Sequence, residues 1–293
     1  MKWNPFNNQI GVALGGGAAK GIAHIGVLKA LEEEDLEISC ISGTSVGALV
    51  ASYYAFGTPV EQILSVGSTL NLSKMINFTW KKRGVFSTDP IRAMLHRDLG
   101  DRKIEEAQIP LAICTTDIET GEQIVFRSGN LADAVCASMA VPGLFVPVEI
   151  GNRTLVDGGI VENVPVSLLN DMGAGITLGV DLTHTKRYAN PTDTLDVINN
   201  AIDIGMDLRT REQLKRADLV ISLELSAYNR TNNADRAHEL YMEGYRAMKA
   251  KANKLRWYRR TNILHYLTKA INQLMPVKIP ELLQSLLNKL KRT

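Results

Sequence analysis

The sequence has few cysteines and no long uncharged apolar run. Its three cysteines, Cys40, Cys114 and Cys136, lie far apart in apolar surroundings. This spacing fits neither a disulfide framework nor a zinc site, so we expect buried thiols in a reducing compartment and no metal. No uncharged apolar stretch approaches the roughly 20 residues that a membrane-spanning helix needs. Met1–Gln9 lacks the apolar centre of a secretory signal, and we therefore expect a cytoplasmic location.

The small net charge of +2 conceals an uneven distribution. Residues 246–293 contain 12 Lys and Arg and a single acid, Glu281, whereas residues 1–245 contain 21 bases and 30 acids. The basic segment also carries Trp257, Tyr258 and leucines at helical spacing, a pattern typical of a helix that lies on anionic lipid. We therefore expect residues 246–293 to contact the inner face of a membrane peripherally.

The second interpretation of the basic segment is that its helices pack on the body of the protein. Its helices would pack their leucines on the acidic body and turn their bases to solvent, and the opposite charges would favour that packing. No recognised binding module surrounds the bases, so we do not expect a nucleic-acid partner.

Short apolar runs alternate with helical patterns over the first two thirds of the chain, which predicts an α/β sandwich. The expected strands are Ile10–Leu14, Ile38–Ser42, Leu111–Thr116, Gln123–Phe126, Val146–Ile150, Thr154–Val156, Gly175–Val180 and Leu219–Leu223. From Asp235 onward the pattern is helical to the end.

A Gly-x-Ser-x-Gly pattern, Gly43-Thr44-Ser45-Val46-Gly47, lies between a predicted strand and a predicted helix. Three fixed residues of about 7% usage each should occur by chance in roughly one chain in ten of this length. The context is more specific than the pattern, because a strand-to-helix turn strains the serine and exposes its hydroxyl at the edge of the sheet. We interpret Ser45 as a nucleophile; the alternative is a glycine-rich turn with an incidental serine.

The segment Gly15-Gly16-Gly17-Ala18-Ala19-Lys20-Gly21 is a second glycine-rich turn between a strand and a helix. Glycines let backbone N–H groups approach a phosphate or the oxyanion of a tetrahedral acyl intermediate. A dinucleotide site would have an acid at the end of the next strand, and a P-loop would have Lys-Ser or Lys-Thr; neither is present. An oxyanion hole fits best.

The third motif is Asp157-Gly158-Gly159, at the end of a predicted strand. Asp-Gly is also a very common turn dipeptide, so the motif has an ordinary structural interpretation. The functional interpretation is a carboxylate beside Ser45 that accepts its proton during attack.

Taken together, these motifs resemble those of the patatin-like phospholipases over about Ile10–Val180. The similarity extends to Gly21–Leu28, Ala137–Phe145 and Asn163–Pro165. The resemblance implies a Ser-Asp dyad of Ser45 and Asp157. It further implies oxyanion donors and motif glycines at Gly16, Gly17, Ala18, Gly43, Gly47, Gly158 and Gly159.

The chain departs from the family pattern at Ala18, where the Gly-x-Gly-x-x-Gly loop has its middle glycine. Alanine keeps its amide, but its methyl group can narrow the hole or change which N–H groups point inward. Lys20, at the start of the following helix, either contacts an anionic substrate or is simply solvated.

Histidines offer a different catalytic arrangement. An α/β-hydrolase has the order Ser, Asp, His, and His184, His238 and His265 all follow Asp157. His184, just past a predicted strand, is the best of the three, while we interpret His24 as a packing residue. Asn71–Phe86 is either a lid or an ordinary connection.

We therefore expect a three-layer α/β/α sandwich with a mostly parallel central sheet over residues 1–230, followed by a helical basic C-terminal extension over residues 231–293. The expected activity is hydrolysis of an acyl ester of a phospholipid, lysophospholipid or related lipid, without a cofactor. One rival is a catalytically weak regulator that binds anionic membranes through the basic segment. Another is a nucleotide-binding protein that uses the Gly15–Gly21 loop.

Overall fold

The structure is a computed structural model, in which residues 8–69, 77–78, 84–184, 188, 190–192, 194–228 and 233–261 are described. Its centre is an eight-stranded sheet with the path β10-β9-β1-β2-β5-β8-β7, and β6 pairs with β5. The strands are β1 (Ile10–Leu14), β2 (Ile38–Thr44), β5 (Leu111–Asp117), β6 (Gln123–Phe126), β7 (Val148–Ile150), β8 (Arg153–Asp157), β9 (Ile176–Asp181) and β10 (Leu219–Ser222). All pairings from β10 to β5 are parallel, and those of β6, β7 and β8 are antiparallel.

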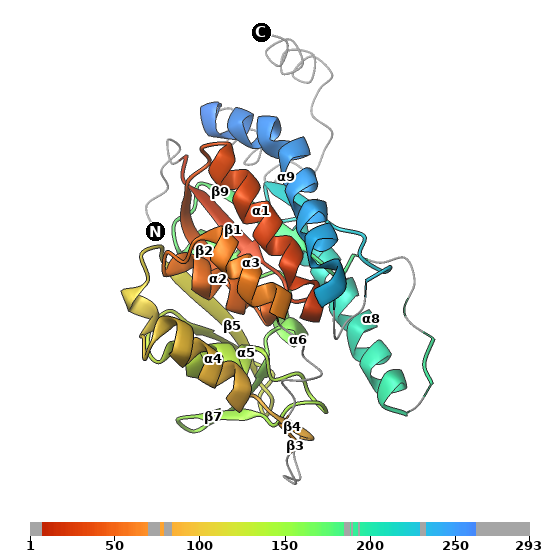
Figure 1. Cartoon of the computed structure of the whole chain (residues 1–293). Coiled ribbons are helices and arrows are strands. Elements are labelled where there is room, and N and C mark those ends of the chain that lie inside the picture. Colours follow the sequence, from red (N-terminus) through yellow and green to blue (C-terminus); the bar gives the residue numbers. More distant parts are fainter. Residues whose placement is uncertain are drawn as a thin grey trace, which may run out of the picture.

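Helices cover the sheet, and several of them lie side by side in front of it in Figure 1. They are α1 (Ile22–Glu33), α2 (Val46–Ala55), α3 (Val60–Thr69), α4 (Asp89–Leu99), α5 (Leu131–Ser138), α6 (Gly159–Glu162), α7 (Val166–Asp171), α8 (Thr194–Leu214) and α9 (Ala237–Arg260). Short 3-10 helices are η1 (Ala18–Gly21), η2 (Ile104–Glu106) and η3 (Ala234–Arg236), and a small ribbon joins β3 (Asn77–Phe78) to β4 (Phe86–Ser87).

Strand β1 shows why the sheet needs helices on both faces. Its residues alternate between the two sides of the sheet, because successive side chains of a strand point in opposite directions. Ile10, Val12 and Leu14 enter the large core that they share with α1, α2 and α9, while Ala13 enters a smaller core with Leu169 of α7. Both faces are therefore buried, and the predicted three-layer α/β/α fold is confirmed.

The register of the parallel strands brings the two glycine-rich turns to one edge. Leu14 at the end of β1 pairs with Gly43 near the end of β2, so the loop after β1 and the elbow after β2 leave the sheet side by side. Strand β2 continues to Thr44, beyond the predicted end at Ser42, because Thr44 pairs with Cys114 of β5. Open α/β sheets bind ligands at such carboxyl ends.

The C-terminal helix α9 packs lengthwise on α1 (Figure 1). It agrees with the helical pattern predicted from Asp235, and residues 262–293 of the predicted extension lie outside the described residues. The domain boundary near residue 230 stays a prediction. Most of the Asn71–Phe86 segment, for which we predicted a lid or a connection, also lies outside the described residues.

Candidate active site

Ser45 occupies the turn between β2 and α2, and its backbone is strained. Its φ of 55° and ψ of −127° belong to a region that side-chain-bearing residues seldom adopt. Its N–H donates to Oγ of Ser138, at 2.8 Å, and that hydroxyl in turn donates to the Cys114 carbonyl, at 2.7 Å. The serine is therefore held in the tight elbow that its motif predicted, with only 8% of its surface exposed.

Asp157 ends β8 next to Ser45. The Gly159 N–H donates to its Oδ1 at 2.8 Å, and its own N–H donates to the Ala140 carbonyl at 3.0 Å. Burial raises the pKa of Asp157 to about 6, while hydrogen bonds from Gly159 and Ser45 oppose the rise and the charge of Asp203 adds to it. The pKa of this carboxyl group is therefore well above that of an ordinary aspartate.

Strand β5 is the element that joins the two residues. Cys114 pairs with Thr44 on one side of β5, and the next residue, Thr115, pairs with Asp157. One residue beyond Thr44 lies Ser45, so two adjacent positions of β5 fix the separation between serine and aspartate. The sequence predicted the strand at Leu111–Thr116, but it gave no sign that this strand pairs in parallel with β2 and antiparallel with β8.

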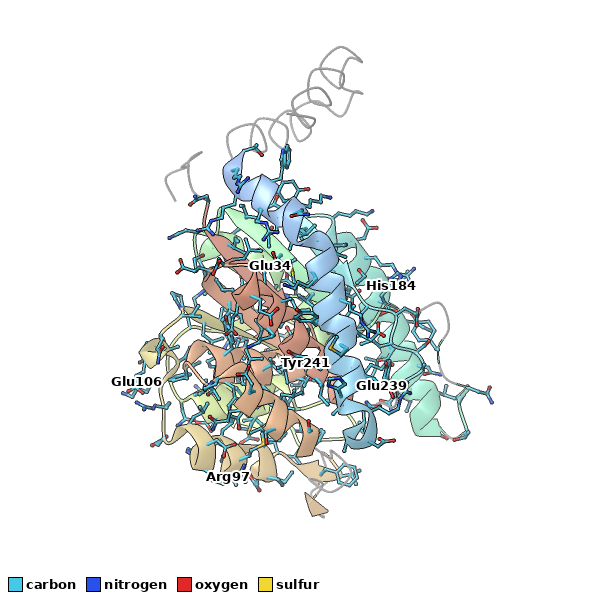
Figure 2. All side chains as sticks on the ribbon, turned by 45° about the horizontal axis from the view of Figure 1, so that its top comes forward. Glu34, Arg97, Glu106, His184, Glu239 and Tyr241 are labelled. Atoms are coloured by element: carbon cyan, nitrogen blue, oxygen red, sulfur yellow. The ribbon has the colours of Figure 1, made fainter. Side chains whose placement is uncertain are left out.

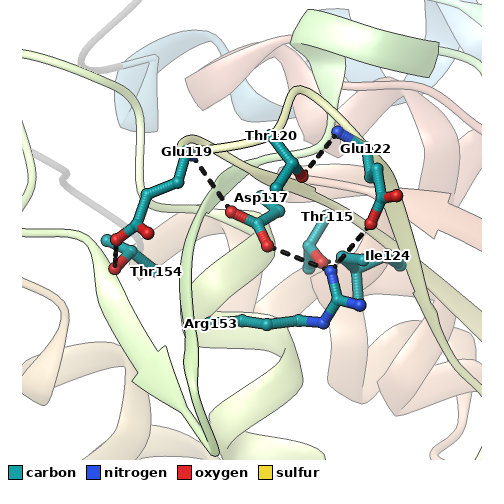
Figure 3. Close-up of polar contacts among 8 residues, drawn as sticks. All are labelled: Thr115, Asp117, Glu119, Thr120, Glu122, Ile124, Arg153 and Thr154. Atoms are coloured by element: carbon teal, nitrogen blue, oxygen red, sulfur yellow. Dashed lines mark hydrogen bonds and ion pairs between the residues drawn. The ribbon is translucent and has the colours of Figure 1, made fainter.

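A polar cluster braces the far end of the β5–β8 pair (Figure 3). Arg153 donates to Asp117 and to Glu122, each at 3.0 Å, and Thr154 donates to Glu119 at 2.8 Å. We had no functional interpretation for these glutamates from the sequence. Their contacts tie the β5–β6 turn to the start of β8 and so support the register that carries Asp157.

The glycine loop lies against the elbow, and its amides differ in their partners. The Gly16 N–H donates to Asn163, both to the backbone carbonyl at 3.3 Å and to Oδ1 at 3.2 Å. The N–H groups of Gly17 and Ala18 donate to no acceptor in the described part of the chain. Ala18 adopts a φ of 53°, a left-handed conformation that glycine tolerates better. An added Cβ on Gly16 would lie 3.4 Å from Cβ of Ser45, which shows how close the loop approaches.

The motif glycines allow backbones to approach closely around the site. A Cβ on Gly47 would lie 2.1 Å from the Leu14 carbonyl oxygen, and one on Gly158 would lie 2.3 Å from that of Cys114. Gly43 would meet the backbone of α2 in the same way, and Gly159 would meet the Met206 side chain. Larger residues at Gly47 or Gly158 would push the elbow and the aspartate turn away from the strands that position them.

Two polar residues that we considered from the sequence, His184 and Lys20, act electrostatically on Glu224. His184 is exposed at the side of the molecule (Figure 2). The pKa of Glu224 is lowered mainly by a hydrogen bond from Ser226, and His184 and Lys20 add smaller attractions. Both bases are therefore close to Glu224. No described histidine forms a hydrogen bond with Ser45 or Asp157.

His24, which we predicted to be a packing residue, is fully buried and also holds the glycine loop. Its Nε2 lies 2.7 Å from the Gly15 carbonyl, and a carbonyl can only accept, so the proton is on Nε2. Burial lowers the pKa of His24 to about 4, and its Nδ1 has no partner among the described residues. Ser138, Asn163 and His24 are thus supporting residues that their contacts alone identify, although all three lie in segments that carried the family resemblance.

Within the described residues, no group of His, Cys, Asp and Glu side chains is arranged to hold a metal ion. The three cysteines are buried and unbridged, and burial raises the pKa of Cys40 and Cys136 to about 11 and that of Cys114 to about 12. These thiols are therefore poor nucleophiles.

Known proteins with similar sequences align with about two thirds of this chain. An NTE family protein of Mycobacterium tuberculosis is 30% identical over 201 residues, which cover 66% of this chain and 56% of the relative. The human patatin-like phospholipase domain-containing protein 6 is 31% identical over 183 residues, 60% of this chain and 13% of the relative. The chain thus spans little more than half the length of the mycobacterial relative and far less of the human one.

A solved structure shares the fold. VipD from Legionella pneumophila superposes with a TM-score of 0.58 at 15% identity, over 85% of this chain and 66% of VipD. The sequence profile described as patatin-like phospholipase matches residues 12–170, a range that contains the glycine loop, the Ser45 elbow and the Asp157 turn. This chain belongs to the patatin-like phospholipase family.

Proposed function

We propose that this chain is a serine hydrolase of lipid acyl esters, with Ser45 as nucleophile and Asp157 as its general base. The observation that carries the proposal is the buried Asp157 carboxyl beside the strained Ser45, with a pKa raised to about 6. A base with a pKa near the working pH is ionised and still able to accept and return a proton. The names of the family and of its relatives support phospholipids or lysophospholipids as the substrate class.

The proposed reaction has two acyl-transfer steps. Asp157 takes the Ser45 proton as Oγ attacks the ester carbonyl, and the N–H groups of Gly17 and Ala18 stabilise the oxyanion. Asp157 then gives the proton to the departing alkoxide, which leaves an acyl-serine. Water, deprotonated by Asp157, cleaves that ester and restores Ser45. Gly16 contributes by holding the loop to Asn163, and His24 by holding Gly15.

Hydrolysis of a short-chain p-nitrophenyl ester tests the proposal directly. Ser45→Ala should reduce turnover to the background rate, and Asp157→Asn should reduce it by about 10²- to 10⁴-fold, the usual contribution of a general base. His184→Ala is the matched control and should keep wild-type activity, because His184 is exposed near Glu224. Activity that does not depend on Ser45 would contradict the proposal and favour the rival regulator.

The pH dependence gives a second test with a defined sign. Only the ionised form of Asp157 accepts a proton, so kcat/KM should fall as the pH drops through about 6. If Asp157 were an ordinary exposed aspartate, this fall of kcat/KM, the acid limb of the pH profile, would lie near pH 4. An acid limb near 4 would therefore show that burial of Asp157 does not control the reaction.

The proposal includes peripheral contact with anionic membranes through residues 246–293, and a cytoplasmic location. No helix in the described ranges is long and apolar enough to cross a bilayer. In α9, Lys249 pairs with Glu33 and Glu34, and Arg256 pairs with Glu34, so these two bases are already engaged. Membrane contact would depend on the remaining bases. Co-sedimentation of the full chain with anionic but not with zwitterionic vesicles tests it.

A further inference from the structure

An apolar cavity lies between the glycine loop and the helices α1, α2 and α3. Together with the solvent at its mouth it contains about 430 Å³ of empty volume. Its wall includes Ala18 from the loop, Ile22 and Ile25 from α1, Val50 from α2 and Gly67 from α3. Every residue that lines it is apolar or glycine. The lining side chains therefore offer no hydrogen bond or opposite charge to a polar headgroup.

The cavity borders the loop and the elbow that position Ser45. Its lining includes Val46, which directly follows Ser45, and Met139, which directly follows the Ser138 that holds the Ser45 amide. A Cβ on Gly21 would lie 2.2 Å from Cγ2 of Val46, so the glycine loop and the elbow are in contact at this wall. An acyl group attached to Ser45, with its oxygen toward the loop amides, would have the cavity beside it.

We propose that this cavity binds the alkyl part of the acyl chain that is cleaved, and that Gly67 sets how much of the chain fits. The inference rests on the hydrolase function proposed above and adds the location of the acyl chain. Apolar cavities hold water poorly and take up apolar ligands. Each methylene that moves from water into such a site strengthens binding about fourfold.

Gly67 controls the space because it faces the opposite wall. A Cβ at this position would lie 3.2 Å from Cδ1 of Ile25 and 3.5 Å from Cγ1 of Ile22. Any side chain at position 67 therefore enters the cavity. Glycine is otherwise unfavourable within a helix, and α3 extends from Val60 to Thr69. Ser65, two residues earlier on α3, is exposed and offers a control position.

Chain-length preference tests the proposal. The wild type should hydrolyse p-nitrophenyl decanoate with a higher kcat/KM than p-nitrophenyl acetate. Gly67→Leu should lose at least about tenfold on decanoate, the effect of excluding two methylenes, with little change on acetate. Ser65→Leu should behave like the wild type on both esters. An equal loss on both esters by folded Gly67→Leu, or no loss on decanoate, would overturn the proposal.

A second variant changes the cavity in the other direction. Val50→Ala removes two methyl groups from the α2 wall, so the preference should move from decanoate toward dodecanoate. An unchanged chain-length preference in folded Val50→Ala would count against the cavity as the acyl site, even where Gly67→Leu does not fold.

A binding measurement separates this inference from the hydrolase proposal. In a Ser45→Ala background, which lacks the nucleophile, titration calorimetry with sodium decanoate should show binding that Gly67→Leu weakens about tenfold and Ser65→Leu does not. Decanoate binding that depends on Gly67, without Ser45-dependent hydrolysis in the wild type, would refute the hydrolase and keep the cavity. Hydrolysis that depends on Ser45, with chain binding indifferent to Gly67, would refute the cavity and keep the hydrolase.

Discussion

Helices α8 and α9 are the longest in the described part of the chain, and they differ in how much of their apolar surface is covered. Helix α9 is rich in Lys and Arg, yet it lies along α1 (Figure 1) and buries apolar residues such as Leu240, Met248 and Leu255. Helix α8 has apolar residues on its outer side, and Val197, Ile204 and Leu208 remain 42–61% exposed. From composition alone, one would expect α8 to be the covered helix and the base-rich α9 to be the exposed one.

Backbone approach explains the docking of α9. A Cβ on Gly244 would lie 1.8 Å from the Ala23 carbonyl oxygen, and one on Gly26 of α1 would lie 1.9 Å from that of Tyr241. The two glycines let the helices meet backbone to backbone, and the bases then reach the acidic end of α1, near Glu34 (Figure 2). A helix with many charges can therefore be a buried structural element.

Helix α8 instead uses its inner side to support the aspartate turn. Arg209 donates to the Ile160 carbonyl and Gln213 to the Val161 carbonyl, each at 2.7 Å, and Met206 contacts Gly159. Its outer apolar side has no such role among the described residues. Helix α9 therefore stabilises the fold, whereas α8 borders the site. Four pairs of variants test this difference.

The largest expected difference is between two glycine-to-alanine substitutions. Gly244→Ala in α9 places a methyl group against the Ala23 carbonyl, and we expect the free energy of unfolding to fall by about 4 kcal/mol. Gly205→Ala in α8 meets open space and should raise that free energy by about 0.5–1 kcal/mol through helix propensity. Urea denaturation measures both. Similar values for the two variants would show that the α1–α9 contact is not close.

The next pair compares two leucines. Leu255 of α9 is fully buried, and Leu255→Ala should lower the free energy of unfolding by about 3 kcal/mol, because it leaves a cavity. Leu208 of α8 is 61% exposed, and Leu208→Ala should change it by less than about 0.5 kcal/mol. Thermal melting checks the ranking. A large loss for Leu208→Ala would mean that another surface covers α8 in solution.

The third pair compares two glutamates. Hydrogen bonds from Lys249 and then Arg256 lower the pKa of Glu34, so its contribution to stability is present above pH 4.5 and is lost as the pH falls through the lowered value. Glu34→Gln should therefore reduce the denaturation midpoint more at pH 7 than at pH 3, and less so in high salt. Glu212→Gln, which removes the exposed pair with Lys215, should leave the midpoint unchanged. Equal effects at both pH values would argue against an ionic role.

Much of the fold follows from the sequence because its parallel strands are buried on both faces and read as short apolar runs. The hairpin around Gly151-Asn152 has residues typical of a tight turn. Asn130, a residue type favoured at helix N-caps, caps α5 by accepting the Asp133 N–H. The pairing of β5 with β8 was not predictable, since it depends on contacts between residues about 40 positions apart.

The site likewise contains residues that the sequence could predict and residues that it could not. Ser45 and Asp157 carry motifs whose local turn chemistry is visible in the sequence. Their neighbours Ser138 and Asn163 act through bonds to Ser45 and Gly16 across 93 and 147 residues, and no local pattern encodes such contacts. The acidic run that ends at Asp35 and the bases of α9 were both visible, but their pairing across more than 200 residues was not.

The smallest expected effect concerns the charge that α8 presents to the site. Asp203 of α8 contributes to the raised pKa of Asp157, behind the larger effect of burial. Asp203→Asn should therefore move the acid-side fall of kcat/KM slightly to lower pH, since like charges raise the pKa of a carboxyl group. Glu34→Gln, which alters the α1–α9 contact, should leave the limb in place. A limb that moves with Glu34→Gln but not with Asp203→Asn would reverse the roles assigned to the two helices, because α9 rather than α8 would then control the charge of the base.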